Sequence, residues 1–167
     1  LIAEVRESYS GDLWYSNFVN AHYARDTDDD HNSDDLKNLG MVDHLSHIGF
    51  NLYTDLVAGD DGTFEDFIAG WSNSYLSGRN LITEVQNLAK SLPKPIIMTE
   101  FGYTPLDGTG NAPLVSSGKP FDYQEQSDAF KAWLETWMSN GEDWLEGVFA
   151  WDLDSSINTV DGVITEF

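Results

Sequence analysis

Cysteine is absent from this sequence of 167 residues, which excludes disulfide bonds, iron–sulfur clusters and zinc sites built on thiolates. Long apolar runs of the length that crosses a bilayer are absent too, so the sequence predicts no transmembrane helix. The P-loop, the G-x-G-x-x-G fingerprint and the G-x-S-x-G nucleophile elbow are also missing. The N-terminal residues show neither an initiator Met nor a signal-peptide pattern, and we expect the natural chain to begin further upstream.

Positive charge is scarce. Eight Lys and Arg residues stand against 29 Asp and Glu residues, which gives a formal net charge of −21. Such a surface repels phosphate groups, so we expect the protein to bind neither nucleic acid nor a membrane surface. An excess of carboxylates suits a salty habitat, where counterions screen the repulsion, and a halophilic protein is therefore one hypothesis. The hydrophobic content of 41% is enough for a packed core, and the length indicates one domain over residues 1–167.

The densest acidic run, at about residues 25–35, has two interpretations. Runs of like charge are usually solvated loops. The alternative is a structural calcium site, because carboxylates recur at alternate positions; the candidate ligands are Asp26, Asp28 and Asp30. The run does not fit the EF-hand template, in which Gly and Glu stand where this chain has His31 and Lys37. A calcium site of another kind stays open, whereas zinc is not expected, because the four His residues lack H-x-x-x-H spacing.

Short apolar stretches alternate with helix-like segments along the chain. Strands are predicted at residues 13–17, 47–53, 95–100 and 145–151. Helices are predicted to begin after Thr63, where Thr63 and Asp66 form a capping-box pattern, near Leu81 and at Asp122. The helix that begins at Asp122 is predicted to carry its apolar residues along one face: Phe130, Trp133, Leu134, Trp137 and Met138. Strict alternation in the third strand places Glu100 on the same face as Ile96 and Met98. Alternating strands and helices predict an α/β fold of parallel βα units, about half of the eight units of a closed barrel. Both ends look truncated, and the missing half-barrel would come from the rest of the chain or from a partner.

One segment carries a family resemblance. The run Pro95-Ile-Ile-Met-Thr-Glu-Phe-Gly-Tyr103 resembles the seventh strand of retaining glycoside hydrolases built on a TIM barrel. Residues 1–15 resemble the fourth helix and fifth strand of these enzymes, residues 48–53 the sixth strand, and residues 147–151 the eighth. Together with Asp107-Gly108 and the spacing from Gln124 to Phe130, the series is most similar to the mannanase-like glycoside hydrolase family 113. The resemblance implies the C-terminal half of a (β/α)8 TIM barrel, strands five to eight, with the acidic run inserted between strands five and six.

The resemblance also implies residue roles. A Glu at the end of the seventh strand is the nucleophile in this clan, which points to Glu100, and the clan's equivalent of Tyr53 donates its phenol to that carboxylate. Trp151 matches the indole that forms the floor of the sugar site, since a flat ring suits the apolar face of a pyranose. The family's acid/base Glu lies after the fourth strand, which places it upstream of residue 1. Further substrate-binding candidates at or just beyond strand ends are Asn17, Asn51, Tyr103, Asp152 and His22.

These residues lead to a first hypothesis and two alternatives. The first is a retaining glycosidase that acts on mannan or a related hemicellulose, needs no cofactor, and is secreted because its substrate is a polymer. This segment alone is expected to be inactive, because retaining hydrolysis needs two carboxyl groups. The second is a carbohydrate-binding or structural protein that keeps the sugar platform without catalysis. The third is a calcium-dependent scaffold built around the acidic run.

Overall fold

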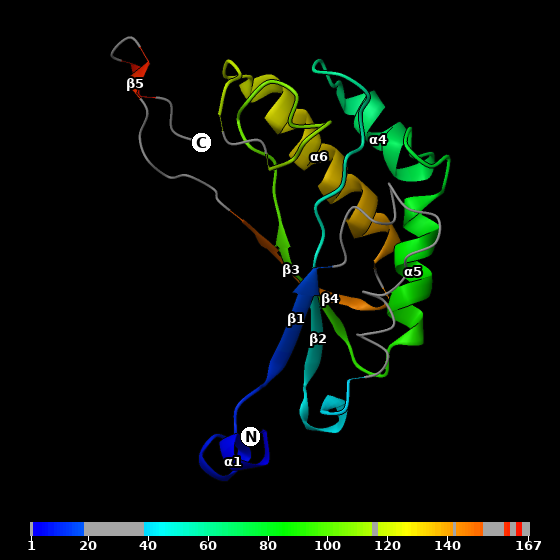
Figure 1. Cartoon of the computed structure of the whole chain (residues 1–167), viewed down its shortest axis with the longest axis vertical. Coiled ribbons are helices and arrows are strands. Elements are labelled where there is room, and N and C mark those ends of the chain that lie inside the picture. Colours follow the sequence, from blue (N-terminus) through cyan, green and yellow to red (C-terminus); the bar gives the residue numbers. More distant parts are fainter. Residues whose placement is uncertain are drawn as a thin grey trace.

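Four parallel strands form the centre of the computed structural model, which describes residues 2–18, 39–114, 117–141, 143–151, 159–160 and 163–164. The strands lie side by side in chain order (Figure 1): β1 (Trp14–Phe18), β2 (His47–Asn51), β3 (Ile96–Phe101) and β4 (Leu145–Ala150). Each bound differs by at most two residues from the predicted strand. The parallel α/β arrangement expected from the sequence is therefore confirmed.

The described helices are of two kinds. The longer ones, α4 (Phe64–Ser72), α5 (Leu81–Ser91) and α6 (Tyr123–Asn140), lie on one side of the sheet (Figure 1). The shorter ones are α1 (Ile2–Ser8), in which no residue is buried, and the 3-10 turn η1 (Val42–His44). A separate antiparallel pair, β5 (Thr159–Val160) and β6 (Val163–Ile164), stands apart from the main sheet. No helix among the described residues is long and apolar enough to span a membrane.

The long helices begin at side-chain caps that the sequence shows. At α4 the Thr63 hydroxyl accepts from the Asp66 amide while the Asp66 carboxylate accepts from the Thr63 amide, which is the predicted capping box. The amide oxygen of Asn80 accepts from the Thr83 amide at 2.9 Å and opens α5. The carboxylate of Asp122 does the same for α6. Because these caps satisfy amides that have no partner inside the helix, they fix where each helix starts.

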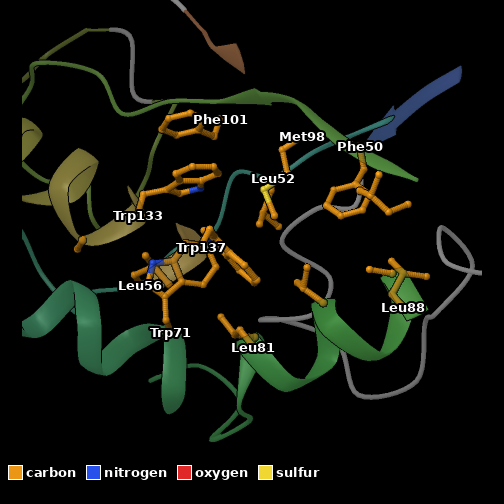
Figure 2. Close-up of a cluster of buried hydrophobic side chains, with 14 of the residues drawn as sticks. Phe50, Leu52, Leu56, Trp71, Leu81, Leu88, Met98, Phe101, Trp133 and Trp137 are labelled. Carbon is orange, nitrogen blue, oxygen red and sulfur yellow. The ribbon is translucent and has the colours of Figure 1, made fainter. Parts of the chain in front are cut away.

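The core lies between the sheet and the three long helices (Figure 2). Ile48, Phe50, Ile96 and Met98 from β2 and β3 are completely buried there. The helices contribute large rings and aliphatic side chains to the same cluster; those labelled in Figure 2 are Trp71, Leu81, Leu88, Trp133 and Trp137. The sheet and helices therefore bury one continuous apolar layer, as expected for parallel βα units.

The buried face of α6 differs from the predicted one. Leu134 and Met138, expected on the apolar face with Trp133 and Trp137, are 43% and 65% exposed. The buried positions include Ala129 and Ala132 instead, so the buried stripe lies to one side of the predicted one. The reason is that small alanines let the helix approach the sheet closely, while the two tryptophans fill the remaining volume.

Candidate active site at the ends of β2, β3 and β4

Two of the predicted site residues meet where β2 and β3 end. Tyr53 lies two residues beyond β2, and its hydroxyl donates a hydrogen bond to Oε2 of Glu100, near the end of β3, at 3.1 Å. Tyr53 is 4% exposed, whereas Glu100 is only partly buried. The structure thus holds the phenol rigidly inside the protein and leaves the carboxylate accessible.

Glu100 does not share the surroundings of Ile96 and Met98, in contrast to the strict alternation expected from the sequence. Those two side chains are completely buried among the helices, but the next side chain to enter that core is Phe101, which is 3% exposed. Its ring stacks on Trp133 with centroids 3.6 Å apart. The register between β3 and its neighbours shifts after Met98, and this irregularity changes the phase of the strand. The expected phase is therefore wrong at Glu100.

Trp151 follows β4 directly and lies near the same strand ends. Its backbone N–H donates to the carbonyl oxygen of Phe101 at 2.7 Å, and its side chain is 55% exposed. Gly102 makes this approach possible, because a Cβ there would lie 2.9 Å from the Trp151 carbonyl oxygen and 3.6 Å from Cε1 of Tyr53. The backbone of Trp151 thus lies next to the segments that carry Glu100 and Tyr53, and its indole is accessible to solvent.

The two predicted asparagines occupy different positions. Asn51 ends β2 and is 6% exposed, and its Oδ1 accepts hydrogen bonds from Ser16 Oγ at 3.0 Å and from Thr99 Oγ1 at 2.7 Å. The side-chain oxygen of Asn51 is therefore already hydrogen-bonded within the protein. Asn17 is partly buried on β1, two strands away from Glu100. Sequence reasoning did not identify Ser16 and Thr99, because a small hydroxyl residue within a strand carries no signal of its own.

Tyr103 is placed differently from the expectation that it binds substrate. Its side chain is 5% exposed, and its ring packs edge-on against Phe67 and Phe130 in the core. Burial raises the pKa of the Tyr103 phenol, and the negative charge of Asp55 adds to this rise. The ring of Tyr103 thus belongs to the core and is not accessible to a substrate. The candidates Asp152 and His22 lie outside the described residues.

The predicted calcium ligands Asp26, Asp28 and Asp30 also lie outside the described residues. The structure brings together a different acidic group, in which carboxylate oxygens of Asp107, Asp122 and Glu125 lie within 4.8 Å of one another. Asp122 caps α6, and both oxygens of Glu125 accept backbone amides at 2.8–3.3 Å; the donors are Gly62, Gly108 and Gly110. These bonds give the two carboxylates a structural role in holding the loop that follows β3.

Solved structures with a similar fold include β-mannanases. Two structures of GH113 β-1,4-mannanases, one of them of a complex, share 20% and 21% sequence identity with the chain and give TM-scores of 0.57 and 0.58; each comparison covers 90% of this chain and 38% of the other. The GH113 β-mannanase AaManA from Alicyclobacillus acidocaldarius, in complex with ManMIm, shares 18% identity with a TM-score of 0.56, over 90% of this chain and 37% of that one.

No protein-family model and no curated protein sequence matches the chain.

By the coverages given above, the chain spans less than half the length of the mannanase structures to which it is similar. A likeness at this level of identity concerns the fold. The predicted resemblance to glycoside hydrolase family 113 is therefore confirmed as a likeness of fold, and the four βα strands have the architecture of part of a TIM barrel.

Proposed function

We propose that this chain is part of a retaining glycoside hydrolase that cleaves a β-linked polysaccharide, either mannan or a related hemicellulose. The observation that carries the proposal is the hydrogen bond from Tyr53 to Glu100. It lies at the carboxyl end of a parallel sheet, which is the edge where barrels of this type keep their active sites. The choice of substrate follows the mannanases whose fold is similar.

In this proposal Glu100 attacks the anomeric carbon of the sugar and forms a covalent glycosyl-enzyme, which water then hydrolyses. Tyr53 holds Oε2 of the carboxylate, so that Oε1 is oriented toward the substrate. A second carboxyl group must lie about 5–5.5 Å from the first to protonate the leaving oxygen and later to activate the water. We assign that group to the segment upstream of residue 1, and the reaction needs no cofactor.

The sugar next to the cleaved bond would lie against Trp151, whose exposed indole offers an apolar surface to the C–H face of a pyranose. Asn17, Asp152 and His22 stay candidates for hydrogen bonds to sugar hydroxyls. Because the matched mannanases are much longer than this chain, we propose that the remaining strands come from the rest of the protein or from a partner. We place the activity outside the cell, since a polymeric substrate does not enter it.

The test is Glu100→Gln in the protein that contains both halves of the barrel, assayed on β-mannan and on mannan oligosaccharides. Glutamine keeps the size of the side chain but cannot form the ester. We expect turnover to fall by about 10⁶-fold, the order seen when the nucleophile of a catalytic unit is removed. Oligosaccharide binding, measured by calorimetry, should persist, because the indole and the remaining hydrogen-bond donors are unchanged.

The matched control is Glu135→Gln, which makes the same chemical change at an exposed position of α6. It should leave turnover unchanged. Full activity of the Glu100→Gln variant would refute the assignment of the nucleophile. Binding of oligosaccharide without turnover in the unsubstituted protein would instead favour a non-catalytic carbohydrate-binding protein.

A further inference from the structure

Strand β3 contains one more residue than its two neighbours just before Glu100. On the β2 side, Phe50 pairs with Met98 but the next residue, Asn51, pairs with Glu100. On the β4 side, Met98 pairs with Val148, and Phe101 pairs with Ala150, so three steps along β3 match two along β4; an opposite shift, with the extra residue on β4, lies earlier, between Ile96 and Ile97. Because both neighbours skip a residue at the same place, the irregularity belongs to β3, and Thr99 is the extra residue of a β-bulge.

The bulge decides where the side chains after Met98 point. Met98 and Phe101 are both buried against the helices, although they are three residues apart, a spacing that regular alternation would not allow. The two side chains between them are both directed away from that core. Thr99 contacts Ser16 and Asn51, and Glu100 accepts from Tyr53. Without the bulge, Glu100 would follow Met98 into the phase that faces the helices.

Side-chain hydrogen bonds across three strands hold the bulged residue. Thr99 and Ser16, from β3 and β1, both donate to the same Oδ1 of Asn51 on β2, at 2.7 and 3.0 Å. Their hydroxyl oxygens also contact each other directly. Two hydroxyl protons are therefore shared among three oxygens, in a cluster that we call the hydroxyl clamp (Ser16, Asn51 and Thr99).

Gly49 leaves the space in which the clamp forms. It lies on β2 between the strands that carry Ser16 and Thr99, and a Cβ at this position would lie 2.6 Å from Cγ2 of Thr99 and 3.2 Å from Cβ of Ser16. Any side chain here would push the two hydroxyl residues apart. Because Gly49 has no side chain, the side chains of Ser16 on β1 and Thr99 on β3 can contact each other across β2.

We propose that the hydroxyl clamp positions Glu100: by fixing Thr99 in the bulge, it turns the following carboxylate toward Tyr53 and the sugar site. This inference rests on the proposed function, because it assigns a role toward the proposed nucleophile. It also assigns Oδ1 of Asn51 to the clamp, so this oxygen is not available to bind a sugar hydroxyl. Ser16, Asn51 and Thr99 are positioning residues, since they act on the reaction only through the orientation of Glu100.

The variant that tests the clamp is Thr99→Val in the protein with both barrel halves, because valine keeps the shape of threonine and removes only the hydroxyl. We expect kcat on mannan oligosaccharides to fall by roughly 10- to 100-fold, the effect of a small misplacement of a reacting group. KM should change little, because the sugar platform is untouched. Thr99→Ser, which restores the hydroxyl, should recover most of the lost kcat.

A second readout does not depend on hydrolysis. The 13C chemical shift of the Tyr53 ring carbon that bears the hydroxyl reports its hydrogen bond to Glu100, and the Tyr53→Phe variant assigns the signal. We expect Thr99→Val to move this signal in the resting protein and Thr99→Ser to return it. If no polysaccharide is hydrolysed, the proposed function fails, and the Tyr53 signal still decides whether the clamp positions Glu100.

The matched control is Thr109→Val, which removes a completely buried hydroxyl that has no hydrogen-bond partner among the described residues. It should change neither kcat nor the Tyr53 signal. Should Thr99→Val not fold, Ser16→Ala removes the other donor to Asn51 and is expected to shift both readouts in the same direction. An unchanged kcat and an unchanged Tyr53 signal in a folded clamp variant would overturn the inference.

Discussion

At the scale of single residues, Glu125 shows how one buried carboxylate organises the loop that follows β3. The side chain is 2% exposed and accepts three backbone amides from two separate segments; the donors are Gly62, Gly108 and Gly110. Desolvation raises the pKa of Glu125, while these amide hydrogen bonds act in the opposite direction. Burial is the larger effect, so losing the proton of Glu125 is less favourable in the folded protein than in the unfolded chain.

This balance predicts a pH dependence that Glu125→Gln should remove. A raised pKa in the folded state contributes stability below the ordinary value of 4.5, and the contribution is lost as the pH rises through the folded value. As the pH rises from 4.5 through the folded-state pKa, the free energy of unfolding of the Gln variant should therefore increase relative to that of the parent, by about 1.4 kcal/mol for each unit of pKa shift. Urea unfolding across this range measures the difference.

The control for this prediction is Glu135→Gln, which removes one negative charge from an exposed position of the same helix. Subtracting its effect corrects for the change in net charge. If the parent protein instead gained stability over Glu125→Gln as the pH rises, the amide hydrogen bonds would outweigh burial, and the direction of the shift would be wrong.

Residue positions at strand ends were the most predictable part of the site. The family resemblance implies that Tyr53 and Glu100 meet, which agrees with their places at the ends of neighbouring strands, and their hydrogen bond is present. The hydroxyl clamp could not be predicted, because it depends on a bulge, and the sequence of β3 reads equally well as a regular strand. The burial of Tyr103 could not be predicted either, since the sequence does not show whether an aromatic side chain in a loop packs into the core or faces solvent.

At the scale of elements, the capping box of α4 is a local device whose contribution is measurable. The Thr63 hydroxyl accepts from the Asp66 amide, and the carboxylate of Asp66 accepts from both the amide and the hydroxyl of Thr63. The hydrogen bonds that the Thr63 hydroxyl and amide donate to the carboxylate lower the pKa of Asp66. Thr63→Ala should reduce the free energy of unfolding by about 1 kcal/mol, because it leaves a helical amide without its partner.

Urea unfolding of Thr63→Ala, with Thr63→Ser as the matched variant, checks this contribution. Serine keeps the hydroxyl and should retain most of the stability. Equal destabilisation by both substitutions would assign the effect to the lost methyl group, and the cap would then contribute little.

Element boundaries could be predicted because they depend on such local signals. The caps at Thr63, Asn80 and Asp122 and the positions of the four strands all follow from neighbouring residues. The buried face of α6 could not, since it depends on how closely the helix approaches the sheet. Leu134 and Met138 are as apolar as the tryptophans beside them, and only the tertiary arrangement leaves them exposed.

At the scale of the whole molecule, the sheet formed by the described strands has an open edge on each side. Among the described strands β1 pairs only with β2, and β4 pairs only with β3. Trp14 and Phe149, which lie on these two outer strands, are 44% and 52% exposed with ring centroids 6.1 Å apart, and neither belongs to the core between the sheet and the helices. Unpaired edges and exposed rings of this kind are a liability in an isolated sheet, and a closed barrel removes both.

The open edges predict how the segment behaves with and without the rest of a barrel. We expect the amides of β1 and β4 to exchange hydrogen faster in the isolated segment than in a protein with both halves, because their outer hydrogen-bond partners are then supplied. The amides of β2 and β3, paired on both sides, should be protected in both preparations. Hydrogen exchange read by mass spectrometry compares the two, and the inner strands serve as the internal control.

Equal exchange of the outer strands in both preparations would mean that the other half does not close the sheet through β1 and β4. Glu100 would then lack the barrel that is expected to supply the second carboxyl group of the reaction.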